Sequence, residues 1–149
     1  MKKPLLAAVA ALAMTLPLAA PIAAEEAPET LVTILTAPEP QTQLMAMVLA
    51  TQAAQKGVAP HVLLCGPAGD IALKDAPESA TAPQPPMAIS PQMLLGKLVA
   101  MPGAKVEVCA LYLPAKGAGA EVLMDGVTVA KPPAMAAAMV APHARVASY

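Results

Sequence analysis

The sequence predicts an α/β domain with a doubly wound, mainly parallel sheet of five strands and helices on both faces. Three observations support this fold class. Short runs rich in β-branched residues recur along the chain, segments with a helical period separate them, and glycines or prolines mark most boundaries. Strands that alternate with helices favour parallel pairing, because each helix returns the chain to the starting end of the sheet. The length of 149 residues fits one domain.

The first elements are a strand, a helix and a second strand. Residues 31–35 form a short apolar run bounded by prolines, which indicates a buried strand. A helix is predicted over 41–56, where apolar residues recur at helical spacing until Gly57 ends the pattern. The second strand is expected at 61–65, and it ends at Cys65 before a glycine turn.

A long segment at 75–91 contains five prolines and has neither a helical nor a strand period. We expect a loop here. Loops of this length are usually covers, binding loops or mobile insertions, so a mobile surface insertion and a cover over a functional site both remain open. Ser90 and Pro91 have the pattern of an N-cap and a first helical residue, and they predict a helix that ends before Pro102 and Gly103.

The C-terminal half continues the alternation. An alternating run carries Cys109, an Asp-Gly turn precedes a short β-branched run, and two prolines open a helical segment where their missing N–H groups cost little. The expected elements are a third strand at 105–110, a fourth strand at 127–129, a helix at 132–139 and a fifth strand at 145–148.

Residues 1–24 have the pattern of a secretory signal peptide, with two lysines, an apolar stretch and small residues at the end. Cleavage after Ala24 would leave one domain at 25–149 in the periplasm. The lysine pair favours a Sec-type signal over the twin-arginine route. A retained membrane anchor is the alternative, but Pro17 and Pro21 interrupt a run barely long enough to span a bilayer. No membrane association is expected after cleavage.

Composition excludes several classes of function. Nine Lys and Arg residues stand against ten Asp and Glu residues, and the chain has two Tyr, no Trp and no Phe. Nucleic-acid binding is not expected, because it needs a basic surface and, for single strands, aromatic platforms. Two cysteines are too few for a disulfide-rich scaffold or a four-cysteine zinc module. No glycine-rich nucleotide loop or serine-esterase elbow occurs, so we expect no cofactor.

Metal binding and carboxylate catalysis also lack a pattern. His61 and His143 have no partner at metal-ligand spacing and are interpreted as strand-end or surface residues. The methionines fall largely in helical segments, where core filling explains them, whereas a copper site would need them clustered. No acid–base pair is identifiable, because Glu107, Glu121 and Asp125 are equally consistent with solvated positions.

The two cysteines are the chemically informative residues. Cys65 and Cys109 are placed at or near the carboxyl ends of predicted strands, where functional groups gather in open parallel sheets. A thiol there acts as thiolate, and a nearby cation lowers its pKa. Lys116 is a candidate for that cation, although a solvated lysine is the other interpretation.

Burial and a disulfide are the alternatives to a reactive thiol. Cysteine is a common small buried residue, and an even count in an exported protein suggests a bridge. In the strand order 2-1-3-4-5, the first strand would separate the two cysteine-bearing strands by about 9–10 Å. A disulfide needs Cα atoms within about 7 Å, so it would require loops that reach beyond the strand ends.

The segments 108–117 (VCALYLPAKG) and 121–127 (EVLMDGV) resemble the DsrE/DsrF-like family, as does the order of the predicted elements. The resemblance implies a small doubly wound domain that forms homo- or hetero-oligomers, often trimers or hexamers, and for this chain we expect a homo-oligomer. Some members relay sulfur as a persulfide on a cysteine after the third strand, and Cys109 matches that position. Tyr112 stands where many relatives have a second cysteine.

Two functions follow from these observations. In the first, the Cys109 thiolate takes sulfur from a donor persulfide and gives it to an acceptor thiol on a partner, which makes the protein a sulfur carrier or sulfurtransferase component rather than a turnover enzyme. In the second, the protein is a non-catalytic oligomeric binding or structural module of the periplasm, with a pocket near the strand ends under the proline-rich loop.

Overall fold

The computed structural model describes residues 29–149, which form one sheet with helices on both faces. The α/β fold class is therefore confirmed. The predicted signal peptide at 1–24 lies outside the described residues. Among the helices in the described part of the chain, none has the length and apolar character needed to cross a membrane.

The elements follow the predicted alternation, with short helical turns added in the connections. The strands are β1 Thr30–Leu35, β2 Ala59–Leu64, β3 Lys105–Val108, β4 Val127–Val129 and β5 Ala144–Ser148. The α-helices are α1 Pro40–Gln55, α2 Glu78–Thr81, α3 Pro91–Val99, α4 Tyr112–Lys116 and α5 Pro132–Met139, and two 3-10 helices are η1 Gly66–Ala72 and η2 Ala120–Val122.

The strand order is β4-β3-β2-β1-β5, and each neighbouring pair is parallel. The order 2-1-3-4-5 considered from the sequence is wrong. Each of the first three connections moves the chain to the next neighbour in the same direction, and only the last connection, through α5, crosses to the far edge beside β1. The strands β2 and β3, which lead into the two cysteines, are therefore adjacent.

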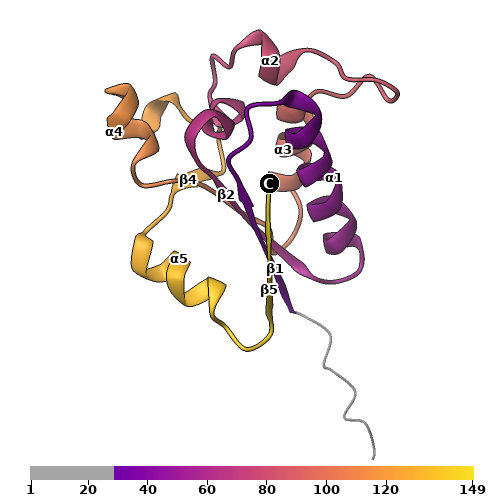
Figure 1. Ribbon diagram of the computed structural model, residues 1–149, viewed down its shortest axis with the longest axis vertical. Helices are drawn as coiled ribbons and strands as arrows, with labels where there is room; N and C mark the ends of the chain where they lie inside the picture. Colours follow the sequence, from indigo (N-terminus) through magenta and orange to yellow (C-terminus); the bar gives the residue numbers. More distant parts are fainter. Residues whose placement is uncertain (1–28) are drawn as a thin grey trace, which may run out of the picture.

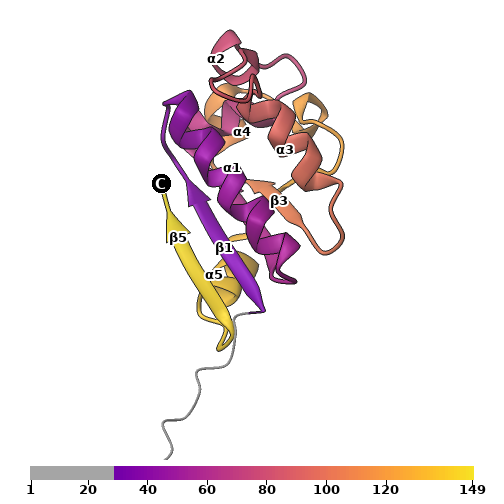
Figure 2. The ribbon, with the colours of Figure 1, turned by 90° about the vertical axis from the view of Figure 1, so that its right-hand side faces the viewer.

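The helices form two layers of unequal size. Figure 1 shows the sheet between α1 and α3 on one side and α5 on the other, and Figure 2 places α5 behind the strands. The larger core lies under α1 and α3 and includes fully buried Leu64, Leu95 and Leu98. The smaller core under α5 consists of the buried residues Val32, Leu63, Ala130 and Met135.

The proline-rich segment, predicted as a loop without periodic structure, contains two short regular features. It contains the one-turn helix α2 and an isolated bridge between Gln84 and Ile89. Pro86 and Met87 line a groove together with Leu44 of α1. The segment therefore packs beside the larger helical layer. The predicted N-cap at Ser90 is confirmed, since its side chain accepts a hydrogen bond from the Met93 N–H at 3.1 Å.

Candidate functional site

Cys65 and Cys109 form a disulfide across the ends of two neighbouring strands. Leu64 pairs with Val108 in the last rung of the β2–β3 ladder, so the next residue of each strand is a cysteine. Their Cα atoms are 5.0 Å apart, within the range that a disulfide spans. The distance argument against a bridge fails because it assumed an intervening strand. Both cysteines of the chain lie in the described residues, and neither is a free thiol.

The backbone holds both cysteines at the rigid end of the sheet. The Cys109 N–H donates to the Leu64 carbonyl at 2.8 Å, and the Cys65 N–H donates to the Leu35 carbonyl at 2.9 Å. These bonds extend the parallel ladders by one residue at each strand. The disulfide thus stands at the carboxyl ends of the strands, where parallel sheets place their functional groups.

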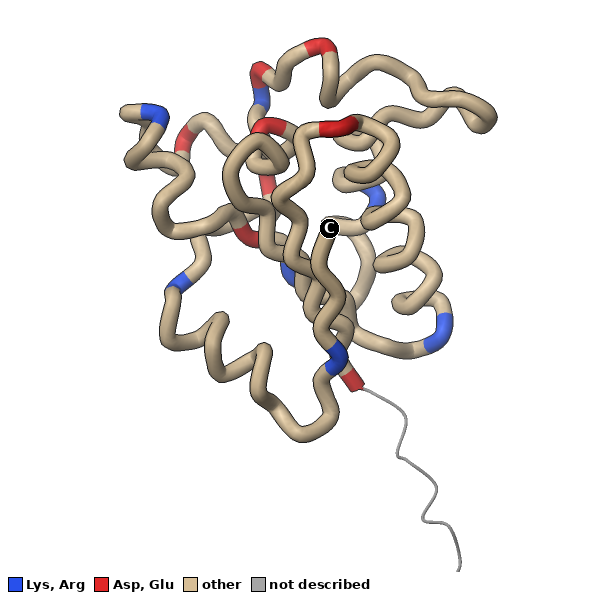
Figure 3. Tube along the Cα trace, viewed as in Figure 1, with Lys and Arg blue, Asp and Glu red and all other residues tan. Residues whose placement is uncertain are grey.

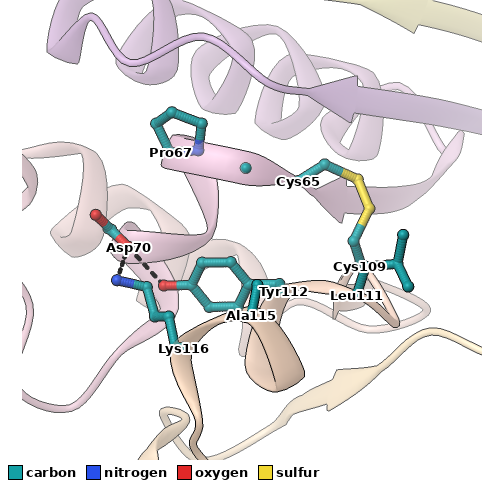
Figure 4. Close-up of a pocket in the computed structure, with 9 residues that line it drawn as sticks. Cys65, Pro67, Asp70, Cys109, Leu111, Tyr112, Ala115 and Lys116 are labelled. Carbon is teal, nitrogen blue, oxygen red and sulfur yellow. Dashed lines mark hydrogen bonds and ion pairs between the residues drawn. A yellow bond between two sulfur atoms is a disulfide. The ribbon is translucent and has the colours of Figure 1, made fainter.

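A cavity of about 560 Å³ opens beside the disulfide. The two cysteines line one end, and Asp70, Tyr112 and Lys116 line the other, as Figure 4 shows. The first turn after β2 and the helix α4 supply these walls. In the part of the chain that the structure describes, the proline-rich segment 75–91 contributes no residue to this lining, which disfavours the alternative in which that loop covers the site.

Asp70 organises the polar end of the cavity. The Tyr112 hydroxyl donates to Asp70 Oδ1 at 2.6 Å, and Lys116 Nζ lies 2.8 Å from the same oxygen. The Lys116 ammonium also lies 5.4 Å from the centre of the Tyr112 ring. Lys116 and Tyr112 lie at the site as predicted from the sequence, whereas Asp70 was not predicted there. The charge of Lys116 is paired with this carboxylate, which reduces its ability to stabilise a cysteine thiolate.

The same contacts set the pKa values at this end. Burial acts to raise the pKa of Asp70, but the hydrogen bonds from Lys116 and Tyr112 and the charge of Lys116 outweigh it and hold the pKa below its ordinary value. Burial and the hydrogen bond to Asp70 raise the pKa of Tyr112 well above its usual range. Tyr112 is therefore a neutral hydrogen-bond donor at physiological pH, and Asp70 is a charged acceptor.

Gly69 makes room for the Tyr112 ring. A Cβ atom at Gly69 would overlap ring carbons of Tyr112, so no larger residue fits without moving the ring. The turn after Cys65 thus has two roles in the site, because Gly69 admits the ring and the next residue, Asp70, holds its hydroxyl. A sequence signal for Asp70 did exist, since loops that follow parallel strands commonly carry functional side chains.

A second cavity of about 300 Å³ lies beneath α5, and Cys109 lines it as well. Leu63, Leu111 and Met135 are among its other walls, and its lining contains no charged residue. Cys65 belongs to the larger cavity alone. Of the two cysteines, Cys109 is therefore the one that lines both cavities.

His61 and Glu107 form a buried pair on β2 and β3. His61 Nε2 lies 2.7 Å from Glu107 Oε2, and the two residues are 7 % and 5 % exposed. The surface or strand-end interpretation of His61 is wrong, and so is a solvated Glu107. Burial acts to raise the pKa of Glu107, but hydrogen bonds from His61 and Lys105 and their charges outweigh it and lower the pKa.

Among the described residues, no group of three or more His, Cys, Asp or Glu side chains is arranged to hold a metal ion. Lys105 Nζ lies 3.1 Å from the same Glu107 oxygen that His61 contacts, so the group that adjoins this buried pair is a cation and not a further metal ligand. A cation at this carboxylate would have to displace a positive charge already present.

Comparisons with known proteins find the fold but not a close relative. No family model matches the chain, and no curated protein matches it. The crystal structure of the YchN protein from E. coli is similar over 82 % of this chain and 99 % of its own, with a TM-score of 0.63 and 15 % identity. MTH1491 from Methanobacterium thermoautotrophicum, a protein of unknown function, is similar over 80 % of this chain and 97 % of its own, with a TM-score of 0.55 and 11 % identity.

Both structures have DsrE/DsrF-like folds, which confirms the resemblance at the level of the fold. At such low identity the likeness establishes an arrangement of strands and helices and carries no activity with it. The function has to be argued from the disulfide and its two cavities.

Proposed function

We propose that this protein carries sulfur as a persulfide on Cys109, with Cys65 as the resolving cysteine. The observation that supports this proposal is the Cys65–Cys109 disulfide at the strand ends, open to a cavity of about 560 Å³. A two-cysteine site has three states: the disulfide, the dithiol, and a persulfide on one sulfur with a thiol on the other. Cys109 is assigned the persulfide because it faces both cavities.

The states interconvert by thiol exchange without an external oxidant. Hydrosulfide attacks Cys109 Sγ, a new S–S bond forms, and the old S–S bond breaks to leave a Cys109 persulfide and a Cys65 thiolate. In the reverse direction, the Cys65 thiolate attacks the inner sulfur of the persulfide and expels hydrosulfide. An acceptor thiolate that attacks the outer sulfur instead becomes a persulfide and leaves Cys109 as thiolate. That dithiol state is recharged by a donor persulfide, which departs as a thiolate.

The compartment in this proposal is the periplasm, reached by the Sec-type signal expected at 1–24. Disulfides persist in oxidising compartments, so a chain exported there would rest in the bridged state. The proposed partners are a sulfur-donor or sulfur-acceptor protein and further copies of the chain, as homotrimers or hexamers.

The test is mass spectrometry of the disulfide form after exposure to sodium sulfide. We expect a mass gain of one sulfur and two hydrogen atoms over the disulfide form, and peptide mapping that places the added sulfur on Cys109 while Cys65 becomes free to alkylation. The matched variants Cys65→Ser and Cys109→Ser both lack the bridge, so a difference between them reports sulfur carriage and not the loss of the disulfide. Given a donor persulfide, Cys65→Ser gains the sulfur and Cys109→Ser does not. Equal labelling of both variants, or of neither, would overturn the proposal.

A second candidate is a structural or binding module in which the bridge has no turnover. The observation that favours it is the cross-link itself, since it ties two adjacent strands over a sequence separation of 44 residues. On this account sodium sulfide and donor persulfides leave the mass unchanged, while the variants without the bridge lose stability only.

A further inference from the structure

Cys109 lines the smaller cavity beneath α5, whereas Cys65 does not. This cavity has a volume of about 300 Å³, and Leu63, Ala130 and Met135 supply its inner walls. These three residues belong to the buried core under α5, and both cysteines pack against that core. A group in this cavity therefore meets the Cys109 side of the bridge.

The surroundings of this cavity are apolar from the inner walls to the mouth. The outer walls include Leu111, which is 80 % exposed, and Met139, which is 37 % exposed. The helix α5 contains only Pro, Ala and Met, and Figure 3 shows it without a charged position along its length. An amphipathic surface helix normally turns polar residues to solvent, so an apolar outer face beside Cys109 points to an apolar ligand.

We propose that the smaller cavity binds the alkyl chain of a small aliphatic thiol, which exchanges with Cys109. This inference rests on the proposed sulfur carriage, because it names the class of the small-molecule acceptor. The cavity lies at the lower end of the size range of small-molecule sites, so it suits a short chain. It offers no charged partner for the carboxylates and amines of peptide-like thiols.

The exchange step needs no other reagent. The alkyl thiolate attacks Cys109 Sγ, the new S–S bond joins the ligand to Cys109, and the Cys65 sulfur leaves as thiolate. When Cys109 holds a persulfide, the same thiolate attacks the outer sulfur. The products are then an alkyl persulfide and the Cys109 thiolate.

The first experiment measures how fast thiols open the disulfide of the full mature chain. Ethanethiol, propanethiol and butanethiol are compared with mercaptoethanol and mercaptoethanesulfonate. Each rate is divided by the rate at which the same thiol opens a small symmetrical disulfide, so that intrinsic thiolate reactivity cancels. We expect the normalised rate to rise about fourfold for each added methylene, as burial of a methylene predicts. Equal normalised rates for alkyl and polar thiols would overturn the inference.

Two alanines of α5 provide a matched pair of variants. Ala136 lines the cavity, whereas Ala137 is exposed on the same helix and does not line it. Ala136→Glu places a carboxylate at the cavity and should lower the normalised butanethiol rate about tenfold, because a charge disfavours an apolar ligand there. Ala137→Glu should leave the rate unchanged. Equal effects of the two variants would show that the cavity is not the binding site.

The position of the adduct is a separate readout. After rapid alkylation, peptide mapping should find the alkyl group on Cys109 and the alkylating agent on Cys65. An adduct on Cys65 would contradict the assigned direction of approach. Failure of sulfide to give a persulfide, with the chain-length preference intact, would refute sulfur carriage and leave a thiol-exchange site. A persulfide with no chain-length preference would refute the alkyl cavity alone.

Discussion

The Cα atoms of Cys65 and Cys109 lie 5.0 Å apart, because the strands that lead into them are neighbours in the sheet and end at the same rung. The bridge consequently joins the first residues after two paired strands. Its position affects both the stability of the sheet and the chemistry at its edge, and these two effects can be measured separately.

Loss of the bridge should lower the free energy of unfolding by about 4 kcal/mol, the chain-entropy value for a closed loop of this length. The double variant Cys65→Ser/Cys109→Ser tests this by urea denaturation. Reduced wild-type protein is the control and should have the same midpoint as the variant. An unchanged midpoint after reduction would mean that the bridge contributes no net stability, which would weaken the structural-module account.

Gly69→Ala should destabilise the protein by about 1–3 kcal/mol, because its Cβ atom would overlap the Tyr112 ring and the overpacked site must shift. The measurement is chemical denaturation of the variant. Gly96→Ala is the control, since a Cβ atom there would lie 3.6 Å from Met124 Cε, an ordinary contact, and alanine is favoured over glycine within a helix. Comparable losses in both variants would contradict the packing argument.

The contact between Asp70 and its two donors should make stability depend on pH in acid. The pKa of Asp70 is lower in the folded state than in the unfolded chain, so its stabilisation is present above about pH 4 and is lost as pH falls through the folded value. Asp70→Asn lacks this titration. The difference in free energy of unfolding between wild type and Asp70→Asn should therefore shrink from neutral pH toward pH 2. A difference independent of pH would exclude this contribution.

The elements could be predicted from the sequence because their signals are local. The helix expected at 132–139 is found with those bounds as α5, and Ser90 caps α3 as expected. Strand order is not a local property. It depends on which neighbouring strand each connection reaches. The order 2-1-3-4-5 placed a strand between the two cysteine-bearing strands, and this wrong order made a disulfide look too long to form. The short helix α4 was missed because five residues carry almost no periodic signal.

The position of the two cysteines in the candidate site could be predicted from the sequence, but the contacts around them could be predicted only in part. Cys65, Cys109, Tyr112 and Lys116 all line the larger cavity. Lys116 and Asp70 are 46 residues apart in the sequence, and neither segment contains a local pattern that predicts their contact. The burial of polar His61 was missed for the same reason, because its partner Glu107 lies on a different strand.

Removal of Glu107 alone should cost more than removal of both members of the buried pair. Glu107→Leu leaves the His61 ring buried without its 2.7 Å partner, which should lower the free energy of unfolding by about 1–3 kcal/mol. In His61→Leu/Glu107→Leu neither member of this pair is left buried without its partner, so much of that loss should be recovered. Lys105→Ala is the control, because the Lys105 side chain is half exposed and its ion pair should contribute less than about 1 kcal/mol. Thermal and urea denaturation of these three variants and of the single variant His61→Leu provide the comparison. Additive losses from the two leucine substitutions would show that His61 and Glu107 do not stabilise each other.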